Sequence, residues 1–183
     1  SFPAGMSVSE VLQTAADLGY DAVELTLEAD GEITMDTPDD KIAEIKEMAD
    51  DLGLKLPTFA TGLHWEHPVV LPGGEKGQQG IDITKTCLRF AEILGASTVL
   101  MVPTTVSPDL QYDVAYNAVQ DVCRELGPVA EEHGVVVGVE NVWNKFLLSP
   151  MEFARFIDEI DHEYVGAYFD VGNVLKTGFP EQW

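Results

Sequence analysis

The chain has 183 residues, of which 45% are hydrophobic, and this is enough for one sizeable core. Its 32 acidic and 10 basic residues give a formal net charge of −22, and the acids are scattered along the sequence rather than gathered in a tail. Such a surface argues against nucleic-acid binding, which needs clustered Lys and Arg, and is typical of salt-adapted proteins.

The sequence contains no apolar run long enough to span a membrane, a length of about 18 residues. It opens on Ser1 without a basic segment followed by an apolar one, so no secretory signal is expected. Cys87 and Cys123 both fall in helical patterns, where buried free thiols are expected rather than a disulfide. We therefore expect a cytoplasmic protein.

Helical and extended patterns alternate along the chain without a break in composition. The spacing of apolar residues predicts helices at 8–18, 37–53, 80–94, 112–133 and 150–160, and strands at 21–27, 54–61, 97–102, 135–140 and 164–169. Ser7 and Ser149 stand where helix caps are expected. The aromatic residues Trp143, Phe153 and Phe156 are expected to pack in the core.

Five strands, each but the last followed by a helix, predict a parallel α/β architecture. A closed (β/α)8 TIM barrel needs roughly 250 residues, which is more than this chain has. We therefore expect residues 1–183 to form a single partial TIM-barrel domain of about five strands, without the first strand and the last two or so units. An open doubly wound sheet is the structural alternative.

Two of the predicted strands end in a single carboxylate. The apolar run 135–139 stops at Glu140, and the run 164–169 stops at Asp170. An unpaired buried carboxylate is costly, so such a residue usually meets a cation or several hydrogen-bond donors. Because ligands bind at the carboxyl ends of parallel strands, we interpret the pair as half of a metal site. The alternative is that each acid accepts hydrogen bonds from a neighbouring loop.

The segments VGVENVWNK at 137–145 and YFDVGN at 168–173 resemble the xylose isomerase-like TIM-barrel superfamily. Within it the chain is most similar to sugar-phosphate isomerases and 3-epimerases such as L-xylulose-5-phosphate 3-epimerase. The segments GYDAVEL at 19–25 and LGA at 94–96 fit the same family. The resemblance therefore covers the whole chain.

The resemblance implies one divalent metal, held by Glu, Asp, His and Glu at the ends of four consecutive strands. Glu140 and Asp170 match the first two ligands, and the other two would lie beyond Trp183. Oxygen ligands suit Mn²⁺ or Mg²⁺, and a His ligand extends the choice to Zn²⁺ or Co²⁺. The resemblance further implies an enediolate mechanism, in which Glu140 is both a ligand and a catalytic proton carrier.

Four further residues are candidates for substrate binding. His64 lies in the loop after the second strand, and Lys145 lies in the loop after Glu140, at the level expected for a phosphate. Glu24 is expected to end its strand as Glu140 does, and Asn173 follows Asp170. Three of the four also have a structural interpretation: a turn for His64 and Asn173, and a hydrogen bond to the first helix for Glu24.

The sequence therefore predicts a divalent-metal-dependent isomerase or epimerase that acts on a small sugar or sugar phosphate. A related dehydratase is chemically close. A non-catalytic or truncated sugar-binding member of the superfamily is the alternative from another class. An endonuclease acting at abasic DNA sites is less favoured, because it needs a basic groove and more His ligands. An open barrel fragment exposes edge strands and core surface, so self-association into a homo-oligomer is one prospect.

Overall fold

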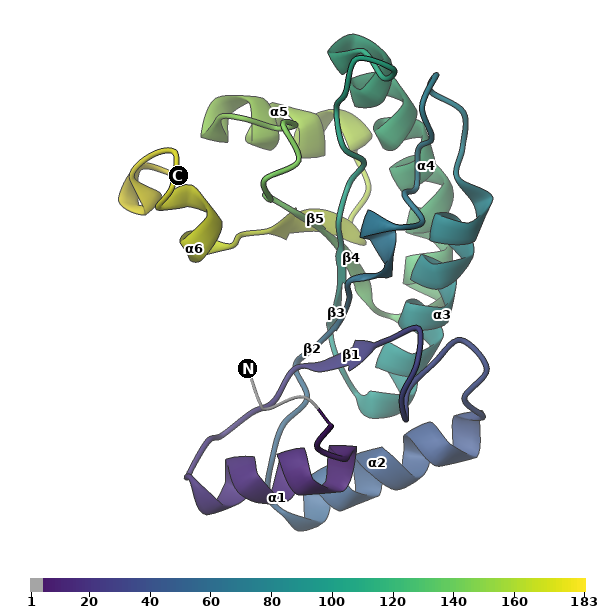
Figure 1. Cartoon of the computed structure of the whole chain (residues 1–183), viewed down its shortest axis with the longest axis vertical. Coiled ribbons are helices and arrows are strands. Elements are labelled where there is room, and N and C mark those ends of the chain that lie inside the picture. The colour runs from purple at the N-terminus through teal and green to yellow at the C-terminus, as the bar shows by residue number, and fades with distance from the viewer. Residues whose placement is uncertain (1–4) are drawn as a thin grey trace.

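The computed structural model describes residues 5–183 and is drawn in Figure 1. The helices are α1 (Val8–Asp17), α2 (Asp39–Asp51), α3 (Gln78–Leu94), α4 (Tyr112–His133), α5 (Pro150–Ile160) and α6 (Val171–Val174). The strands are β1 (Leu25–Leu27), β2 (Thr58–Thr61), β3 (Thr98–Met101), β4 (Val136–Glu140) and β5 (Val165–Tyr168). No helix within this described part is both long and apolar enough to cross a membrane.

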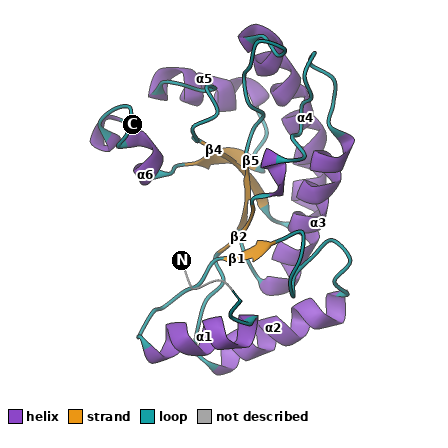
Figure 2. Ribbon diagram, in the orientation of Figure 1, coloured by secondary structure: helices purple, strands orange, loops and turns teal. Residues whose placement is uncertain are grey.

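The five strands form one parallel sheet in the order β1-β2-β3-β4-β5. The sheet is curved, and helices α1 to α5 lie on its outer side (Figures 1 and 2). Sequential strand order is that of a β/α barrel, whereas a doubly wound sheet reverses its order at a switch point. The structure therefore confirms the parallel TIM-barrel type of architecture, here as an incomplete barrel, and excludes the doubly wound alternative.

One row of side chains across the sheet packs against the helices. Leu25, Phe59, Val99, Val137 and Val165 are register partners from strand to strand, and each is at most 6% exposed. Because neighbouring residues of a strand point to opposite faces, the residues between them face the concave side. Because this row is buried against the helices, the alternate residues of each strand are the ones that lie on the concave face.

The helix starts follow their capping residues. Ser7 and Glu10 form a reciprocal capping box at the start of α1, and the Ser149 hydroxyl accepts the backbone N–H of Glu152 at the start of α5. The pattern at 37–38 differs slightly, since Pro38 is the N-cap of α2 rather than its first helical residue. These caps satisfy backbone donors that the helices cannot satisfy themselves.

The first two strands are shorter than the sequence predicts. The β1–β2 ladder begins at Leu25, and upstream of it a single parallel bridge joins Ala22 to Lys55. Pro57 lies between that bridge and β2 and has no N–H to donate to a ladder. The extended segments therefore begin where predicted, but their regular pairing starts later.

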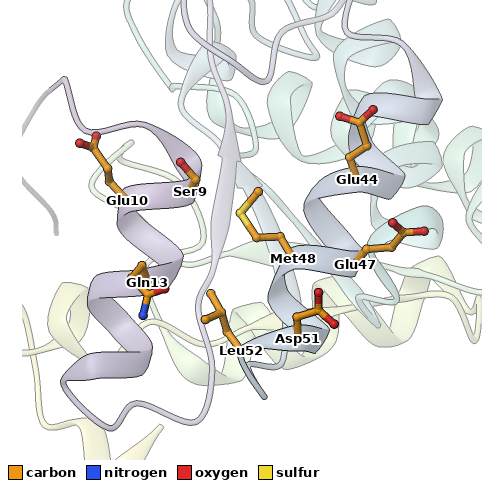
Figure 3. Close-up of a pocket in the computed structure, with 8 residues that line it drawn as sticks. All are labelled: Ser9, Glu10, Gln13, Glu44, Glu47, Met48, Asp51 and Leu52. Carbon is orange, nitrogen blue, oxygen red and sulfur yellow. The ribbon is translucent and has the colours of Figure 1, made fainter.

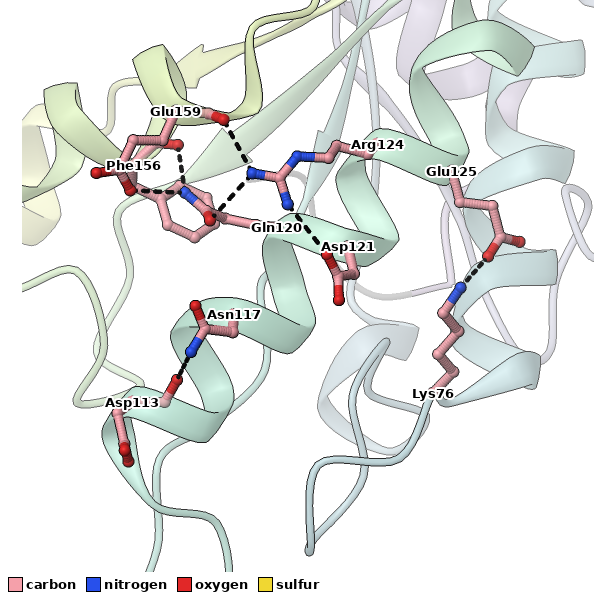
Figure 4. Close-up of polar contacts among 9 residues, drawn as sticks. All are labelled: Lys76, Asp113, Asn117, Gln120, Asp121, Arg124, Glu125, Phe156 and Glu159. Carbon is pink, nitrogen blue, oxygen red and sulfur yellow. Dashed lines mark hydrogen bonds and ion pairs between the residues drawn. The ribbon is translucent and has the colours of Figure 1, made fainter.

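Polar contacts join α4 to α5 on the outer surface (Figure 4). Gln120 donates from Nε2 to the backbone oxygen of Phe156 at 3.2 Å and to the carboxylate of Glu159 at 3.1 Å. Arg124 donates to the backbone oxygen of Glu159 at 2.9 Å. Beneath them the Phe156 ring is fully buried, so the two helices are held by an apolar contact with polar groups at its edge.

Large apolar side chains are exposed near β5 and the segment that follows it. They include Leu148, Met151, Phe169, Leu175 and Phe179, and each is at least 42% exposed. The edge of β5 also lacks a further strand among the described residues. Self-association through this region remains a prediction.

Gly138 leaves room on the concave face for a ring from the next strand. A Cβ atom placed on Gly138 lies 3.0 Å from both Cβ and Cδ2 of Tyr168 and 3.0 Å from Cγ2 of Thr98. A Cβ placed on Gly166, its partner in β5, meets only Val136, at 3.6 Å. Tyr168 therefore lies against β4 only because residue 138 has no side chain.

We expect Gly138→Ala to lower the free energy of unfolding by about 1–3 kcal/mol, because the added methyl group overpacks this face. Gly166→Ala is the matched control and is expected to be neutral or slightly stabilising, since its methyl group has room. Urea denaturation of both variants checks this. Equal stabilities for the two would contradict the packing described.

Candidate functional site

The two strand-ending carboxylates share one asparagine. Glu140 is the last residue of β4, and Asp170 follows β5 as the N-cap of α6. The Asn173 side chain donates from Nδ2 to Oε1 of Glu140 at 3.2 Å, and its backbone N–H donates to Oδ1 of Asp170 at 2.8 Å. The structure therefore brings three predicted site residues together at the carboxyl ends of adjacent strands.

Asn141 fixes the position of Asp170 relative to β4. Its Nδ2 donates to the backbone oxygen of Asp170 at 2.9 Å, and its Oδ1 accepts the backbone N–H of Asp170 at 2.7 Å. A third bond runs from Nδ2 of Asn173 to the backbone oxygen of Asn141 at 2.9 Å. A buried side chain thus extends the pairing of β4 and β5 beyond the last ladder position.

Glu140 lies in an environment that disfavours its charge. It is 8% exposed, and burial, followed by the negative charges of Asp170 and Glu24, raises its pKa to about 7. The hydrogen bond from Asn173 acts in the opposite direction but is the smallest of these effects. A cation held between these acids would relieve both the desolvation and the repulsion.

The carboxylates at the two strand ends are suitable ligands for a hard divalent cation, but two of them do not complete its coordination. Glu140 and Asp170 supply carboxylate oxygens, which are ligands that Mg²⁺ and Mn²⁺ favour. Within residues 5–183, however, no group of three or more His, Cys, Asp or Glu side chains is arranged to hold a metal. Within the described residues the two predicted ligands are neighbouring carboxylates, and their binding of a metal stays a prediction.

Glu24 does not end the first strand, because it directly precedes β1, and it reaches the same concave face from the opposite edge of the sheet. Its Oε2 accepts hydrogen bonds from the Tyr168 hydroxyl at 2.6 Å and from the Thr58 hydroxyl at 2.5 Å. Burial, together with the bond to Glu24, raises the pKa of Tyr168 to about 12, so the phenol stays protonated and donates. Glu24 thus bonds to β2 and β5 rather than to the first helix, and it adds negative charge near Glu140.

His64 lies away from these carboxylates. Its ring is 2% exposed, and Nε2 lies 3.0 Å from the hydroxyl of Thr84 on α3. That hydroxyl donates to the backbone oxygen of Gly80, so it accepts from Nε2–H, and Nδ1 is left without a partner among the described residues. Sugar binding by His64 stays a prediction that would require the covering segments to move.

Lys145 lies in a loop that a buried asparagine holds in place. Asn144 is fully buried and donates from Nδ2 to the backbone oxygens of Pro103 and Thr104, at 3.2 and 2.8 Å. Its Oδ1 accepts the backbone N–H of Phe146 at 3.2 Å. Lys145 adopts a positive φ of 59°, an uncommon conformation that these bonds maintain.

The prediction that Trp143 packs in the core is wrong. Phe153 and Phe156 are buried as expected, but Trp143 is 57% exposed. Its indole Nε1 donates to the backbone oxygen of Asn173 at 3.0 Å, and its ring lines a pocket of about 550 Å³ next to the carboxylates. An indole N–H with a partner at a rim explains why this large side chain stays partly in solvent.

A second hollow of about 610 Å³ lies between α1 and α2 (Figure 3). Met48 and Leu52 point toward α1, and Glu44, Glu47 and Asp51 also line the hollow on the α2 side. None of the predicted site residues lines it. We assign it no role.

Residues 12–183 match the model of the xylose isomerase-like TIM barrel family. The chain belongs to this family. That match, the sequential parallel sheet and the two strand-ending acids agree with the resemblance found in the sequence. Among the proteins that the chain resembles, several are named as sugar epimerases, and the chain spans less than two thirds of the length of the two described first below.

The chain is similar to the following three proteins, among others. L-ribulose-5-phosphate 3-epimerase of Escherichia coli O157:H7 is 22% identical over 180 residues, which cover 95% of this chain and 62% of that protein. The crystal structure of D-psicose 3-epimerase in the presence of D-fructose has a TM-score of 0.78 at 17% identity, covering 94% of this chain and 61% of that one. A xylose isomerase-like TIM-barrel protein from Mycobacterium smegmatis, in complex with magnesium, has a TM-score of 0.71 at 21% identity, covering 95% and 59%.

Three residues of this region were not among the predicted site residues. Asn141 and Asn144 are buried amides that position the two strand ends and the loop, and Tyr168 bonds to Glu24 across the concave face. The alternation of side chains in a strand provides a signal for Tyr168, because it lies two residues before Asp170. No comparable signal identifies which Asn of the loop is buried.

His64 makes the stability of the protein depend on pH. Burial lowers its pKa from 6.5 to about 4, so the unfolded chain takes up a proton first as the pH falls. The contribution of the neutral His64 ring to the free energy of unfolding is complete above pH 6.5. It is lost progressively as the pH falls toward 4, by about 3 kcal/mol in all. We expect His64→Gln to reduce the loss of unfolding free energy between pH 7 and 5.

Urea denaturation at pH 7, 6 and 5 measures this slope independently of any change in absolute stability. His67→Gln is the control, because His67 lies in the same loop but is not buried. A slope that His64→Gln leaves unchanged, or that His67→Gln reduces equally, would contradict the neutral buried ring.

Proposed function

We propose that this chain carries part of the active site of a divalent-metal-dependent isomerase or epimerase of a sugar or sugar phosphate. The observation that carries the proposal is the pairing of Glu140 and Asp170 through Asn173 at adjacent strand ends. The E. coli relative is named for a phosphorylated ketose, and D-psicose 3-epimerase is named for an unphosphorylated one. Both substrate classes are therefore included.

Each residue of the site has a role in this proposal. Glu140 removes the proton from the carbon next to the substrate carbonyl and becomes protonated, which gives an enediolate. Epimerisation is completed when a second acid returns a proton to the opposite face, and the family resemblance implies that this acid is a glutamate beyond Trp183. Asn173 orients Glu140: its Nδ2 donates to Glu140 and to the backbone oxygen of Asn141, which leaves Oδ1 as the atom that would accept from a substrate hydroxyl group. Lys145 binds the distal end of the substrate, and Glu24 accepts from Tyr168 and limits the depth of the site.

Glu140 and Asp170 would hold a divalent ion, with Mn²⁺ or Mg²⁺ favoured and Zn²⁺ or Co²⁺ as alternatives. Such an ion supplies Lewis-acid polarisation of the substrate oxygens. The magnesium complex of the M. smegmatis neighbour supports this choice of ion class. The concentration of negative charge around Glu140 supports it from the residues of this chain.

A non-catalytic sugar-binding protein is the alternative from another class. The partly filled ligand set within the described residues is compatible with it. The two proposals differ in one property: only an enzyme exchanges the proton next to the carbonyl with solvent. Metal binding alone does not separate them.

We expect Mn²⁺ to bind the protein at one site that Glu140→Gln weakens at least tenfold, because the variant removes a charged ligand. Isothermal titration calorimetry at 0.15 M salt, which screens the acidic surface, measures this. Glu132→Gln is the matched control, since Glu132 is exposed on α4. An equal affinity of both variants would show that Mn²⁺ binds only the general acidic surface.

We expect the protein with Mn²⁺ to exchange the C3 hydrogen of a ketose or ketose phosphate for deuterium in D₂O. Loss of a general base predicts that Glu140→Gln slows this exchange by about 10²-fold or more. Proton NMR of D-fructose and D-ribulose 5-phosphate follows the reaction. Exchange requires only one proton carrier on one face, so it does not depend on a second glutamate. Binding of both sugars without exchange would favour the non-catalytic alternative.

A further inference from the structure

Most cations of this acidic chain are paired with carboxylates. Ion pairs neutralise Lys41, Lys46, Lys76, Lys85, Arg89, Arg124 and Arg155. The pair between Lys76 and Glu125 is drawn in Figure 4. Of the 10 basic residues, all within the described part, only Lys55, Lys145 and Lys176 make no ion pair. With 32 acids available, an unpaired lysine is unusual in this molecule.

Two of these three lysines line the same pocket. Lys145 and Lys176 both border the pocket of about 550 Å³ that also contains Asn141 and Asn173, the residues that hold the strand-ending carboxylates. Lys145 comes from the loop after β4, and Lys176 follows α6. Two lysines without an ion pair therefore line one pocket beside the proposed reaction centre.

Neighbouring groups fix the backbone beside Lys145 and the ammonium group of Lys176. The buried Asn144 fixes the backbone on the N-terminal side of Lys145. The ammonium group of Lys176 lies 3.9 Å from the ring centroid of Trp143, a cation–π contact. The same Trp143 donates from Nε1 to the backbone oxygen of Asn173. Trp143 thus joins the two segments to each other, and the charge of Lys176 is positioned by this ring rather than by a carboxylate.

The surrounding charge explains why an anionic ligand needs such cations. The chain carries a net charge of −22, and Glu24, Glu140 and Asp170 add negative charge at the site. A dianionic ligand is repelled by this field unless positive charge lies where it binds. A phosphate monoester carries a charge of about −1.5 to −2 at pH 7, which two lysines match, whereas a carboxylate carries only one charge.

We infer that Lys145 and Lys176 form a binding subsite for the phosphate group of a phosphorylated ketose. The inference rests on the proposed function, because it places the sugar at Glu140 and Asp170 and its phosphate at this pocket. It assigns the substrate to phosphorylated ketoses rather than to free ones. The exposed face of Trp143 then covers the apolar part of the pocket between the two ends of the substrate.

The test compares D-ribulose 5-phosphate with D-ribulose, two probes that differ only in the phosphate group. Calorimetric titrations are carried out without metal and in the presence of a chelator, so that only protein groups contribute. We expect the phosphorylated probe to bind more tightly, and we expect Lys145→Gln and Lys176→Gln each to weaken it about tenfold or more. Neither variant is expected to change the binding of D-ribulose.

Lys55→Gln is the matched control. Lys55 is also unpaired, but it precedes β2, at the opposite end of the sheet from Glu140. It is expected to change the affinity less than twofold. An equal loss of affinity for D-ribulose 5-phosphate in Lys55→Gln would show that the effect comes from net charge alone, and this would overturn the subsite. Equal affinities of the protein for the two probes would also overturn it. Lys145→Arg and Lys176→Arg keep the charge and are expected to keep the binding, which guards against misfolding of the Gln variants.

D-gluconate tests the other anionic class. If it binds as tightly as D-ribulose 5-phosphate and with the same dependence on both lysines, the phosphate assignment is overturned in favour of sugar acids. Failure of the proposed function is recognised separately by deuterium exchange. Exchange that depends on Glu140 but is insensitive to the two lysines, for the phosphorylated and free ketose alike, retains the function and overturns the subsite.

Discussion

The candidate site depends on the parallel register between β4 and β5, which pairs Glu140 with Tyr168. This register places Asp170 just beyond the ladder, where Asn141 and Asn173 hold it next to Glu140. A shift of one residue would turn Glu140 toward the helices, where burial of a charge is far more costly. The apolar row on the outer face of the sheet, from Leu25 to Val165, opposes such a shift.

The same arrangement gathers negative charge that does not favour folding. Glu140 has a raised pKa because burial and two neighbouring acids oppose its ionisation. Among the described residues, the Lys and Arg side chains lie either away from Glu140 or at the adjacent pocket. Titratable residues with a shifted pKa that lie beside a cleft are common at catalytic sites. The two lysines Lys145 and Lys176 extend this logic, since neither forms an ion pair and a substrate anion would supply the opposite charge.

Local signals in the sequence predicted most of the fold and half of the site. Apolar runs flanked by helical patterns predicted the five strands, and the two serine caps and the acids Glu140 and Asp170 lie where expected. Contacts between distant residues were not predictable: Tyr168 bonds to Glu24, 144 positions away, only because the sheet curves. Trp143 was wrongly assigned to the core, because a large aromatic residue carries no local sign that it lies at a rim. The pattern likewise gave no sign that His64 is covered by α3.

The central claim is that Glu140 and Asp170 jointly bind a divalent ion at the carboxyl ends of β4 and β5. Paramagnetic broadening of amide NMR signals by substoichiometric Mn²⁺ measures this most directly, because broadening falls off steeply with distance from the ion. The account predicts that the signals of Asn141 and Asn173 broaden first, before those of the acidic surface residues Glu44 and Glu47 on α2. If the α2 signals broaden first or equally, the ion binds the general acidic surface and the claim is contradicted.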